Sequence, residues 1–105
     1  MAIIRAPRPS DRFAQISNEA LSDERLSYRA RGVLAYLLSR PNGWRTTSAE
    51  IARQGVEGRD AVRVALQELE TFGYMARRKH RDPDSGRWKH DQFVTDHPED
   101  RPEHG

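Results

Sequence analysis

The sequence predicts a small α+β domain in which three main helices are followed by a charged β-hairpin. The strongest helical signal lies in residues 58–75, GRDAVRVALQELETFGYM, where apolar side chains recur at three- and four-residue steps. Residues 74–95 resemble two strands, because basic stretches flank a run of turn-forming residues. With 105 residues, of which 35% are apolar, the chain is expected to bury one modest core.

Composition excludes several classes of protein. The chain contains no cysteine, which rules out disulfides and thiolate metal sites and indicates a reducing compartment. No apolar run approaches membrane-spanning length, and the N-terminal apolar stretch is too short for a signal peptide. We therefore expect a cytoplasmic protein with no membrane contact. Glycine-rich phosphate loops and nucleophile elbows are missing from the sequence, so we expect no enzymatic activity, no cofactor and no small-molecule ligand.

The two ends of the chain are expected to lie outside the folded domain, which we place at residues 13–95. Residues 1–12 are expected to form a flexible basic arm. This arm either stays disordered or reaches into the minor groove of a nucleic acid, if the protein binds one. Residues 96–105 form an acidic, disordered tail; the alternative is that the acidic end folds over the basic hairpin and competes with its ligand. Between them, residues 13–16 are expected to form a short N-terminal strand and residues 18–21 a single helical turn.

The first long helix is expected at residues 28–40. Ser27 is placed to accept hydrogen bonds from the free backbone N–H groups of its first turn. Its apolar stripe faces the core and consists of Ala30, Val33, Leu34, Leu37 and Leu38. Pro41, Asn42 and Gly43 end the helix, and Trp44 is expected to pack over the core.

Two further helices follow in close succession. Thr47 and Glu50 fit a capping box that opens a short helix through about Gln54, with Gly55 placed for its C-terminal cap. The next helix starts after Gly58 and ends at Gly73, which supplies a left-handed stop. A tight, glycine-containing turn therefore joins two helices, which is the helix-turn-helix arrangement, whose second helix lies in the major groove of DNA.

Positive charge is concentrated in the predicted hairpin. Residues 74–81 and 87–95 are the two strands, around the turn at residues 82–86. Residues 74–90 carry a net charge of +4, whereas residues 13–73 are neutral and residues 91–105 carry −4. Such a cluster favours a polyanion, because each phosphate that is neutralised releases condensed counterions. The alternative is a solvated hairpin face with no ligand.

With these elements in place, the chain resembles a winged helix-turn-helix domain. It is most similar to the small domains of plasmid, phage and primosomal replication proteins of the DnaD-like type, and more loosely to GntR and MarR regulators. The matching segments are LSDERLSYRARGVLAYLLSRPNGW at residues 21–44, TSAEIA at residues 47–52, and RDAVRVALQELETFGYM followed by the basic hairpin that closes at GRW. The resemblance covers most of residues 13–95.

The resemblance implies a set of DNA-binding residues. Thr47 and Ser48 match positions that usually touch backbone phosphate. The exposed face of the recognition helix is matched by Arg59, Asp60, Arg63 and Gln67, of which the arginines suit guanine and the glutamine suits adenine. The wing is matched by Arg77, Arg78, Lys79, Arg81, Arg87 and Lys89, which hold phosphates and carry little sequence information. The alternative for Arg59 and Arg63 is a solvated surface with salt bridges to Asp60 or Glu70.

We therefore expect a sequence-specific double-stranded DNA-binding protein that acts as a homodimer. A transcriptional regulator and a replication or maintenance protein of a plasmid or phage are both compatible with the sequence, and a winged helix that binds another protein is the alternative. A metal site built from His90, Asp91, Asp96, His97 and His104 is not expected, because their spacing follows no known ligand pattern.

Overall fold

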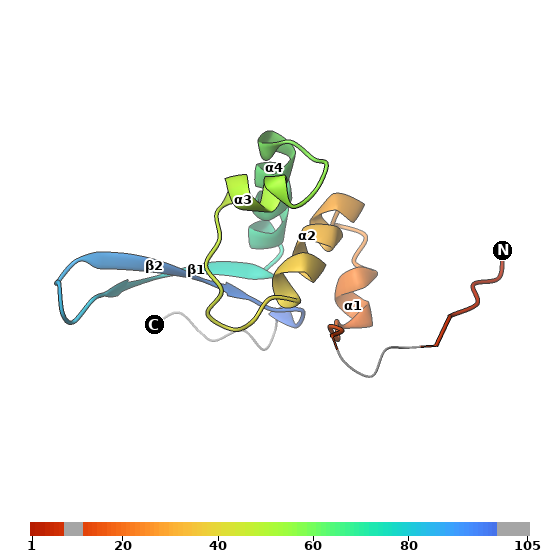
Figure 1. Ribbon diagram of the computed structural model, residues 1–105, viewed down its shortest axis with the longest axis horizontal. Helices are drawn as coiled ribbons and strands as arrows, with labels where there is room; N and C mark the ends of the chain where they lie inside the picture. The colour runs from red at the N-terminus through yellow and green to blue at the C-terminus, as the bar shows by residue number, and fades with distance from the viewer. Residues whose placement is uncertain (8–11, 99–105) are drawn as a thin grey trace.

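The computed structural model describes residues 1–7 and 12–98 and shows a small α+β domain, as predicted. The helices are α1 (Asn18–Leu21), α2 (Tyr28–Leu38), α3 (Ser48–Arg53) and α4 (Arg59–Thr71), and the strands are β1 (Met75–Arg81) and β2 (Trp88–Val94). The two strands form an antiparallel hairpin that leaves the helical part at the end of α4 and extends far to one side (Figure 1).

The predicted N-terminal strand is wrong. Residues 13–16 form no strand, and the only sheet in the described ranges 1–7 and 12–98 consists of β1 and β2. Only two large apolar residues, Phe13 and Ile16, occur in this stretch, and their spacing of three does not specify a strand face. The segment is instead fixed at its end, where the backbone N–H of Ser17 donates to the carboxylate of Asp96. Asp96, the first residue of the predicted tail, is thus packed against the start of α1, and residues 99–105 lie outside the described residues.

The helix starts agree with the sequence more closely than the helix ends. Ser27 Oγ accepts from Ala30 N at 3.0 Å, and Thr47 Oγ1 accepts from Glu50 N at 3.2 Å, so both predicted N-caps are present. However, α2 ends at Leu38, two residues before the predicted end, where Ser39 caps it. α3 ends at Arg53 with Gln54 as its C-cap.

The two glycines predicted to end helices behave differently. Gly73 adopts a left-handed conformation with φ of 87°, as predicted, and Tyr74 N then donates to the carbonyl of Leu69 at 2.8 Å. Gly55 does not have a positive φ, so it is not the left-handed cap of α3. The chain therefore needs glycine at the exit from α4 and not at the exit from α3.

The core lies between α2, α3 and α4. Leu34 of α2 and Leu69 of α4 are completely buried, and Ile51 is the side chain through which α3 joins them. Met75 at the start of β1 attaches the hairpin to the same cluster. Trp44, by contrast, does not cover the core: it is 54% exposed, and the guanidinium of Arg40 lies 5.8 Å from its ring centroid.

A hydrogen-bonded hub at Asp23 fixes the loop before α2 to the start of the hairpin. The Asp23 carboxylate accepts from Arg25 Nε at 2.9 Å and Arg25 Nη2 at 2.7 Å, and from the Tyr74 hydroxyl at 2.7 Å. Its backbone carbonyl accepts from Arg31 Nη2 at 2.6 Å. The side chain of Asp23 is only 9% exposed. The hydrogen bonds from Arg25, with one from Tyr74, hold the pKa of Asp23 well below its usual range.

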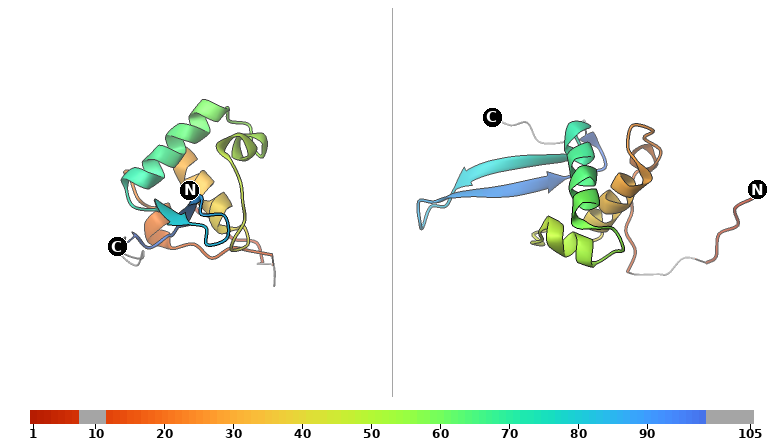
Figure 2. Two further views of the ribbon diagram at one scale, coloured as in Figure 1. Left: turned by 90° about the vertical axis from the view of Figure 1, so that its left-hand side faces the viewer. Right: turned by 90° about the horizontal axis from the view of Figure 1, so that it is seen from above.

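A second polar contact joins α2 directly to α4. The carboxylate of Glu68 accepts from Ser27 N at 2.7 Å and from Ser27 Oγ at 2.9 Å. Ser27 therefore caps its own helix and is held by another one. Beyond this helical part the molecule is elongated, with extents of 56 × 30 × 28 Å and a radius of gyration of 15.6 Å, against about 13 Å for a compact chain of this size. Figure 2 shows that the hairpin extends from one side of the helical part and the N-terminal residues from the other.

Replacing Asp23 with asparagine is expected to lower the midpoint of thermal unfolding at pH 7 by roughly 4 to 8 °C, because the charge-assisted bonds from Arg25 are lost. The pKa of Asp23 is depressed in the folded protein, so its contribution is complete above about pH 4 and disappears as the pH falls toward the folded value. The difference between the two proteins should therefore shrink below pH 4. Asp60→Asn is the matched control, since Asp60 is 99% exposed; an equal loss there would contradict the role of the hub.

Two glycine-to-alanine substitutions should have opposite effects on stability. Gly73→Ala forces a Cβ into the left-handed region and is expected to lower the free energy of unfolding by about 1–2 kcal/mol. Gly32→Ala, in the middle of α2, adds a Cβ into open space and is expected to raise it by about 0.5–1 kcal/mol. Urea unfolding of both variants measures the difference; stabilisation by Gly73→Ala would refute the assigned turn.

Candidate functional site

The exposed face of α4 carries four polar residues at helical spacing. Arg59, Asp60, Arg63 and Gln67 are all exposed, while Val62, Ala65 and Leu69 bury the opposite face. Packing of the apolar face onto α2 and α3 thus turns the polar face outward. The structure brings these four predicted residues together on one surface.

One ion pair on this face bears on the alternative for the arginines, a solvated surface with salt bridges and no ligand. Arg63 Nη1 lies 3.8 Å from Asp60 Oδ1, and the two side chains are 62% and 99% exposed. A pair this long and this exposed contributes little to stability. Arg63 therefore keeps its hydrogen-bond donors accessible, and Asp60 supplies one local negative charge beside them.

The start of α3 holds the other two predicted helical residues. Thr47 is exposed but uses its hydroxyl oxygen to cap α3, and Ser48 is half-buried as the first residue of the helix. The capping box is only half formed among the described contacts, since Glu50 Oε2 accepts from Thr46 Oγ1 at 3.4 Å. Thr47 thus has a structural role whether or not it meets a ligand.

Strand register sorts the hairpin cations into two faces. Alternate residues of a strand point to the same side, so Arg77, Lys79 and Arg81 share one face of β1. Gln92 lies opposite Arg77 and Trp88 lies opposite Arg81, which places both on this face as well. In the described part of the chain, none of these three cations has an ion pair with a carboxylate. We call the surface formed by Arg77, Lys79, Arg81, Trp88 and Gln92 the open face.

The opposite face is partly neutralised by acidic side chains. Lys89 Nζ lies 3.0 Å from Asp82 Oδ2, and His80 Nδ1 lies 3.4 Å from Asp91 Oδ2. Asp82 also accepts from the backbone N–H of Asp84 at 2.9 Å, and this bond together with Lys89 lowers the pKa of Asp82 to about 2. Lys89, predicted as a phosphate contact, is therefore already engaged within the protein.

Two predicted hairpin residues lie elsewhere. Arg87 is exposed at the end of the turn, where its backbone carbonyl accepts from Asp82 N at 2.8 Å. Arg78 belongs to β1 in register with Asp91, and its side chain lies outside the described part of the structure.

Trp88 is the residue whose importance the sequence understated. The sequence leaves two expectations for Trp88, packing at the base of the hairpin or lying against a sugar of the nucleic acid. Because β2 begins at Trp88, the ring sits at the distal end, and packing at the base is wrong. The ring is 57% exposed, with Lys79 Nζ at 4.8 Å and the Arg81 guanidinium at 5.7 Å from its centroid. The period-two spacing of residues 77, 79 and 81 was visible in the sequence, but the register that puts Trp88 beside them was not.

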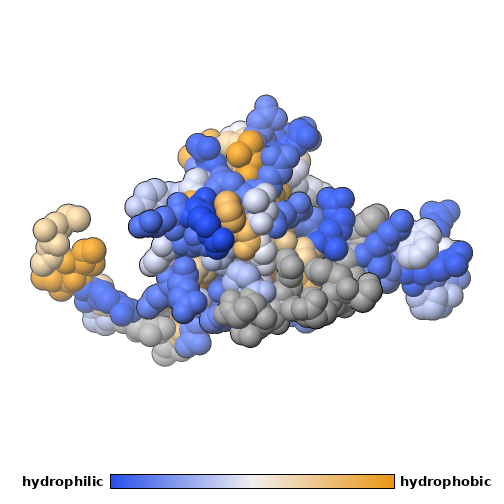
Figure 3. Space-filling model, turned by 180° about the vertical axis from the view of Figure 1, so that it is seen from behind, coloured by the Kyte–Doolittle hydropathy of each residue, from blue (hydrophilic) through white to orange (hydrophobic). Residues whose placement is uncertain are grey.

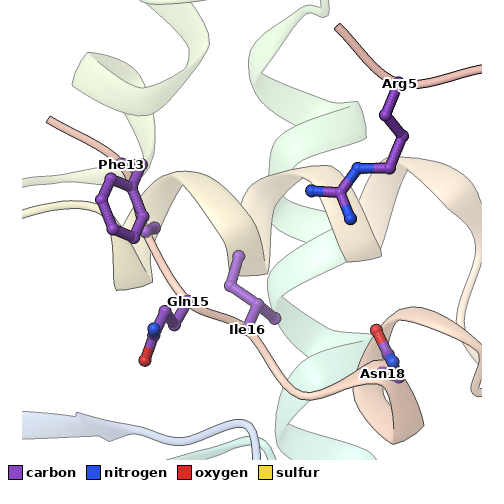
Figure 4. Close-up of a pocket in the computed structure, with 6 residues that line it drawn as sticks. Arg5, Phe13, Gln15, Ile16 and Asn18 are labelled. Carbon is purple, nitrogen blue, oxygen red and sulfur yellow. The ribbon is translucent and has the colours of Figure 1, made fainter. Parts of the chain in front are cut away.

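Two hollows lie away from these surfaces. One, of about 430 Å³, is bounded by Arg5 of the N-terminal arm and by the segment before α1; Figure 4 shows Phe13, Gln15, Ile16 and Asn18 around it. The other, of about 450 Å³, lies between α2, α3 and α4 and includes Tyr28, which is 86% exposed. Residues 1–7 and 12–98 contain no cluster of three or more side chains able to hold a metal ion.

Surface character differs along the molecule. In Figure 3 the projecting hairpin is hydrophilic, and the strongly apolar N-terminal residues lie at the other end. Among the described residues, no helix has both the length and the apolar character that crossing a membrane requires.

The chain matches no protein-family model, no curated protein and no solved structure. Its function is therefore inferred from the arrangement of its own side chains.

Proposed function

We propose that the chain is a sequence-specific double-stranded DNA-binding domain of the winged helix-turn-helix type. In this proposal α3 and α4 form the helix-turn-helix, α4 enters the major groove, and the β1–β2 hairpin is the wing. The observation that carries it is the open face, where Arg77, Lys79 and Arg81 project from the core without a carboxylate partner in the described part of the chain.

The geometry of α4 supports a role in reading bases. Its exposed face begins at the N-terminal end of the helix with Arg59 and Arg63, the end that major-groove helices direct at base edges. Arg63 can donate two hydrogen bonds to guanine, and Gln67 can pair with adenine. Asp60, whose carboxylate lies 3.8 Å from the Arg63 guanidinium, adds a negative charge that disfavours close approach of phosphate. This favours base contact over phosphate contact for Arg63.

The hairpin supports a role in affinity. Two strands alone are marginally stable in water, so a projecting hairpin rich in cations is hard to explain by folding. Phosphates of DNA would supply the negative charge that the cations of the open face lack in the described part of the chain. Under this proposal Lys89 and Thr47 keep their contacts within the protein, and the phosphates are held by Arg77, Lys79, Arg81 and Arg87.

Biological role and assembly are part of the same proposal. A transcriptional regulator of a bacterial or mobile-element promoter fits a small domain that binds DNA in the cytoplasm, and a plasmid or phage replication protein fits equally well. A homodimer would place two α4 helices on paired half-sites. Selection of bound sequences from a random duplex pool would test the homodimer, because a palindromic consensus reports both the site and its symmetry.

A protein-interaction module is the second candidate. It is favoured by the hollow between α2, α3 and α4, where Tyr28 is exposed beside the buried edges of Val33 and Val62. An exposed aromatic at the rim of an apolar groove suits a partner side chain. The two candidates differ in their response to salt.

Binding to duplex DNA should weaken steeply with salt. If the four hairpin cations of this proposal engage phosphates, the logarithm of affinity should fall against the logarithm of salt concentration with a slope of about −3.6, from roughly −0.9 per phosphate. Arg77→Gln should reduce the steepness by about 0.9. Arg29→Gln on α2 is the matched control and should leave the slope unchanged, since Arg29 lies neither on α4 nor on the hairpin. A flat response of the unmodified protein would favour the protein-interaction module.

Arg63→Ala should weaken binding to the selected sequence by about 1–3 kcal/mol and binding to a scrambled duplex far less. The reason is that a bidentate contact to guanine is lost only where that base is present. Competition titrations of both duplexes measure the ratio. Equal loss on the two duplexes would show that Arg63 contacts phosphate instead, and Val64→Ala, a neighbouring exposed position, controls for general damage to α4.

A further inference from the structure

Trp88 lies in an environment that folding alone does not require. It is 57% exposed at the far end of the hairpin, remote from the core that Leu34 and Leu69 form. Its contacts are with Lys79 and Arg81, both of which hold their charges near the ring. In the described residues its indole N–H has no hydrogen-bond partner. A large aromatic surface is thus partly exposed to solvent beside two cations.

The cations continue as a row along the same face. Arg77, Lys79 and Arg81 occur at every second residue of β1, so their Cα atoms are about 6.8 Å apart. This spacing is close to the distance between successive phosphates of one nucleic-acid strand. Gln92, opposite Arg77, adds an amide that can both donate and accept. The open face therefore combines a line of cations with an aromatic platform at its end.

We propose that the open face binds an unpaired strand of DNA, with a base stacked on Trp88 and the adjoining phosphates held by Arg77 and Lys79. This inference rests on the proposed function, from which it takes DNA as the ligand, and it adds a preference for duplexes that carry a single-stranded segment. α4 would hold the duplex, and the tip of the hairpin would hold the strand that leaves it.

The aromatic ring distinguishes an unpaired strand from a duplex. Both offer phosphates to the cations, but a paired base has its faces covered by its neighbours in the stack. Only an unpaired base exposes a face on which an indole can lie, and such stacking is tolerant of sequence. The cations beside the ring add attraction to the phosphates that adjoin the stacked base. Trp88 thus gains a contact from a single strand that a blunt duplex does not provide.

Fluorescence tests the stacking directly, because the chain contains two tryptophans in similar settings. Trp44 is 54% exposed and lies against Arg40, as Trp88 is 57% exposed and lies against Lys79. The variant Trp44→Phe reports on Trp88 alone, and Trp88→Phe reports on Trp44 alone. Titration with an oligothymidylate of about a dozen nucleotides should quench Trp88 and leave Trp44 unchanged. Equal quenching of both, or of neither, would overturn the proposal.

Affinity measurements test the energetic role. Trp88→Ala should weaken binding of the oligothymidylate roughly five- to 150-fold, the range that corresponds to loss of one stacked base. Trp44→Ala is the matched control and should change it less than about twofold, and Trp88→Phe should retain most of the affinity because it keeps an aromatic face. If Trp88→Phe weakened binding as much as Trp88→Ala, stacking would be refuted. Unchanged thermal unfolding of the variants confirms that the exposed position does not affect the fold.

A blunt duplex and the same duplex with a single-stranded tail separate this inference from the proposed function. The tailed duplex should bind more tightly, and Trp88→Ala should remove that advantage while leaving the blunt duplex unaffected. Tight binding of the blunt duplex with no gain from the tail would overturn the inference and leave the proposed function standing. Binding of the oligothymidylate together with failure to bind either duplex would support the open face and refute the role of α4. Preference for an oligouridylate of equal length would overturn the assignment to DNA.

Discussion

The direction in which the hairpin leaves the helices depends on the Asp23 carboxylate. Asp23 holds the hydroxyl of Tyr74, the residue that links Gly73 to β1, and it is itself held by the guanidinium of Arg25. The carbonyl of Tyr74 accepts from Thr95 N at 2.9 Å, so the end of β2 is tied to the same point. One partly buried carboxylate therefore anchors both strands to the loop before α2. This anchor helps to set the position of the hairpin cations relative to α4.

Beyond that anchor, the hairpin is stabilised by contacts of its own. The turn closes through Asp82 N to the carbonyl of Arg87 and Gly86 N to the carbonyl of Asp82, both at 2.8 Å, with Gly86 in the left-handed region. Lys89 pairs with Asp82, while Trp88 lies under Lys79 on the other face. The two faces thus differ in charge. Acidic groups partly neutralise one face, whereas the other keeps its positive charge available beside an exposed aromatic ring.

Local patterns predicted the helices and the hairpin but wrongly predicted a strand at residues 13–16, and contacts between distant residues determined what the patterns could not. Ser27 and Thr47 marked helix starts because a cap is a local hydrogen bond. The end of α2 carried no comparable signal, so its last two residues were misplaced. Trp44 was wrongly expected over the core because the burial of an aromatic depends on tertiary packing. For the candidate site, the residue types were visible in the sequence, but assigning Lys89 to an internal pair and Trp88 to the open face required the strand register, since a shift by one residue exchanges the faces.

The distribution of charge explains why, in the proposed function, α4 would contact bases and the hairpin would contact phosphates. On α4, Asp60 beside Arg63 offsets part of the positive charge, so that helix gains little from phosphates in general and more from a base that matches its donors. On the open face no described carboxylate offsets Arg77, Lys79 and Arg81, so the hairpin gains from any strand of phosphates. Selectivity in such an arrangement has to come from two features that charge alone does not supply: the hydrogen-bond pattern of α4 and the ring of Trp88, which distinguishes unpaired bases from paired ones.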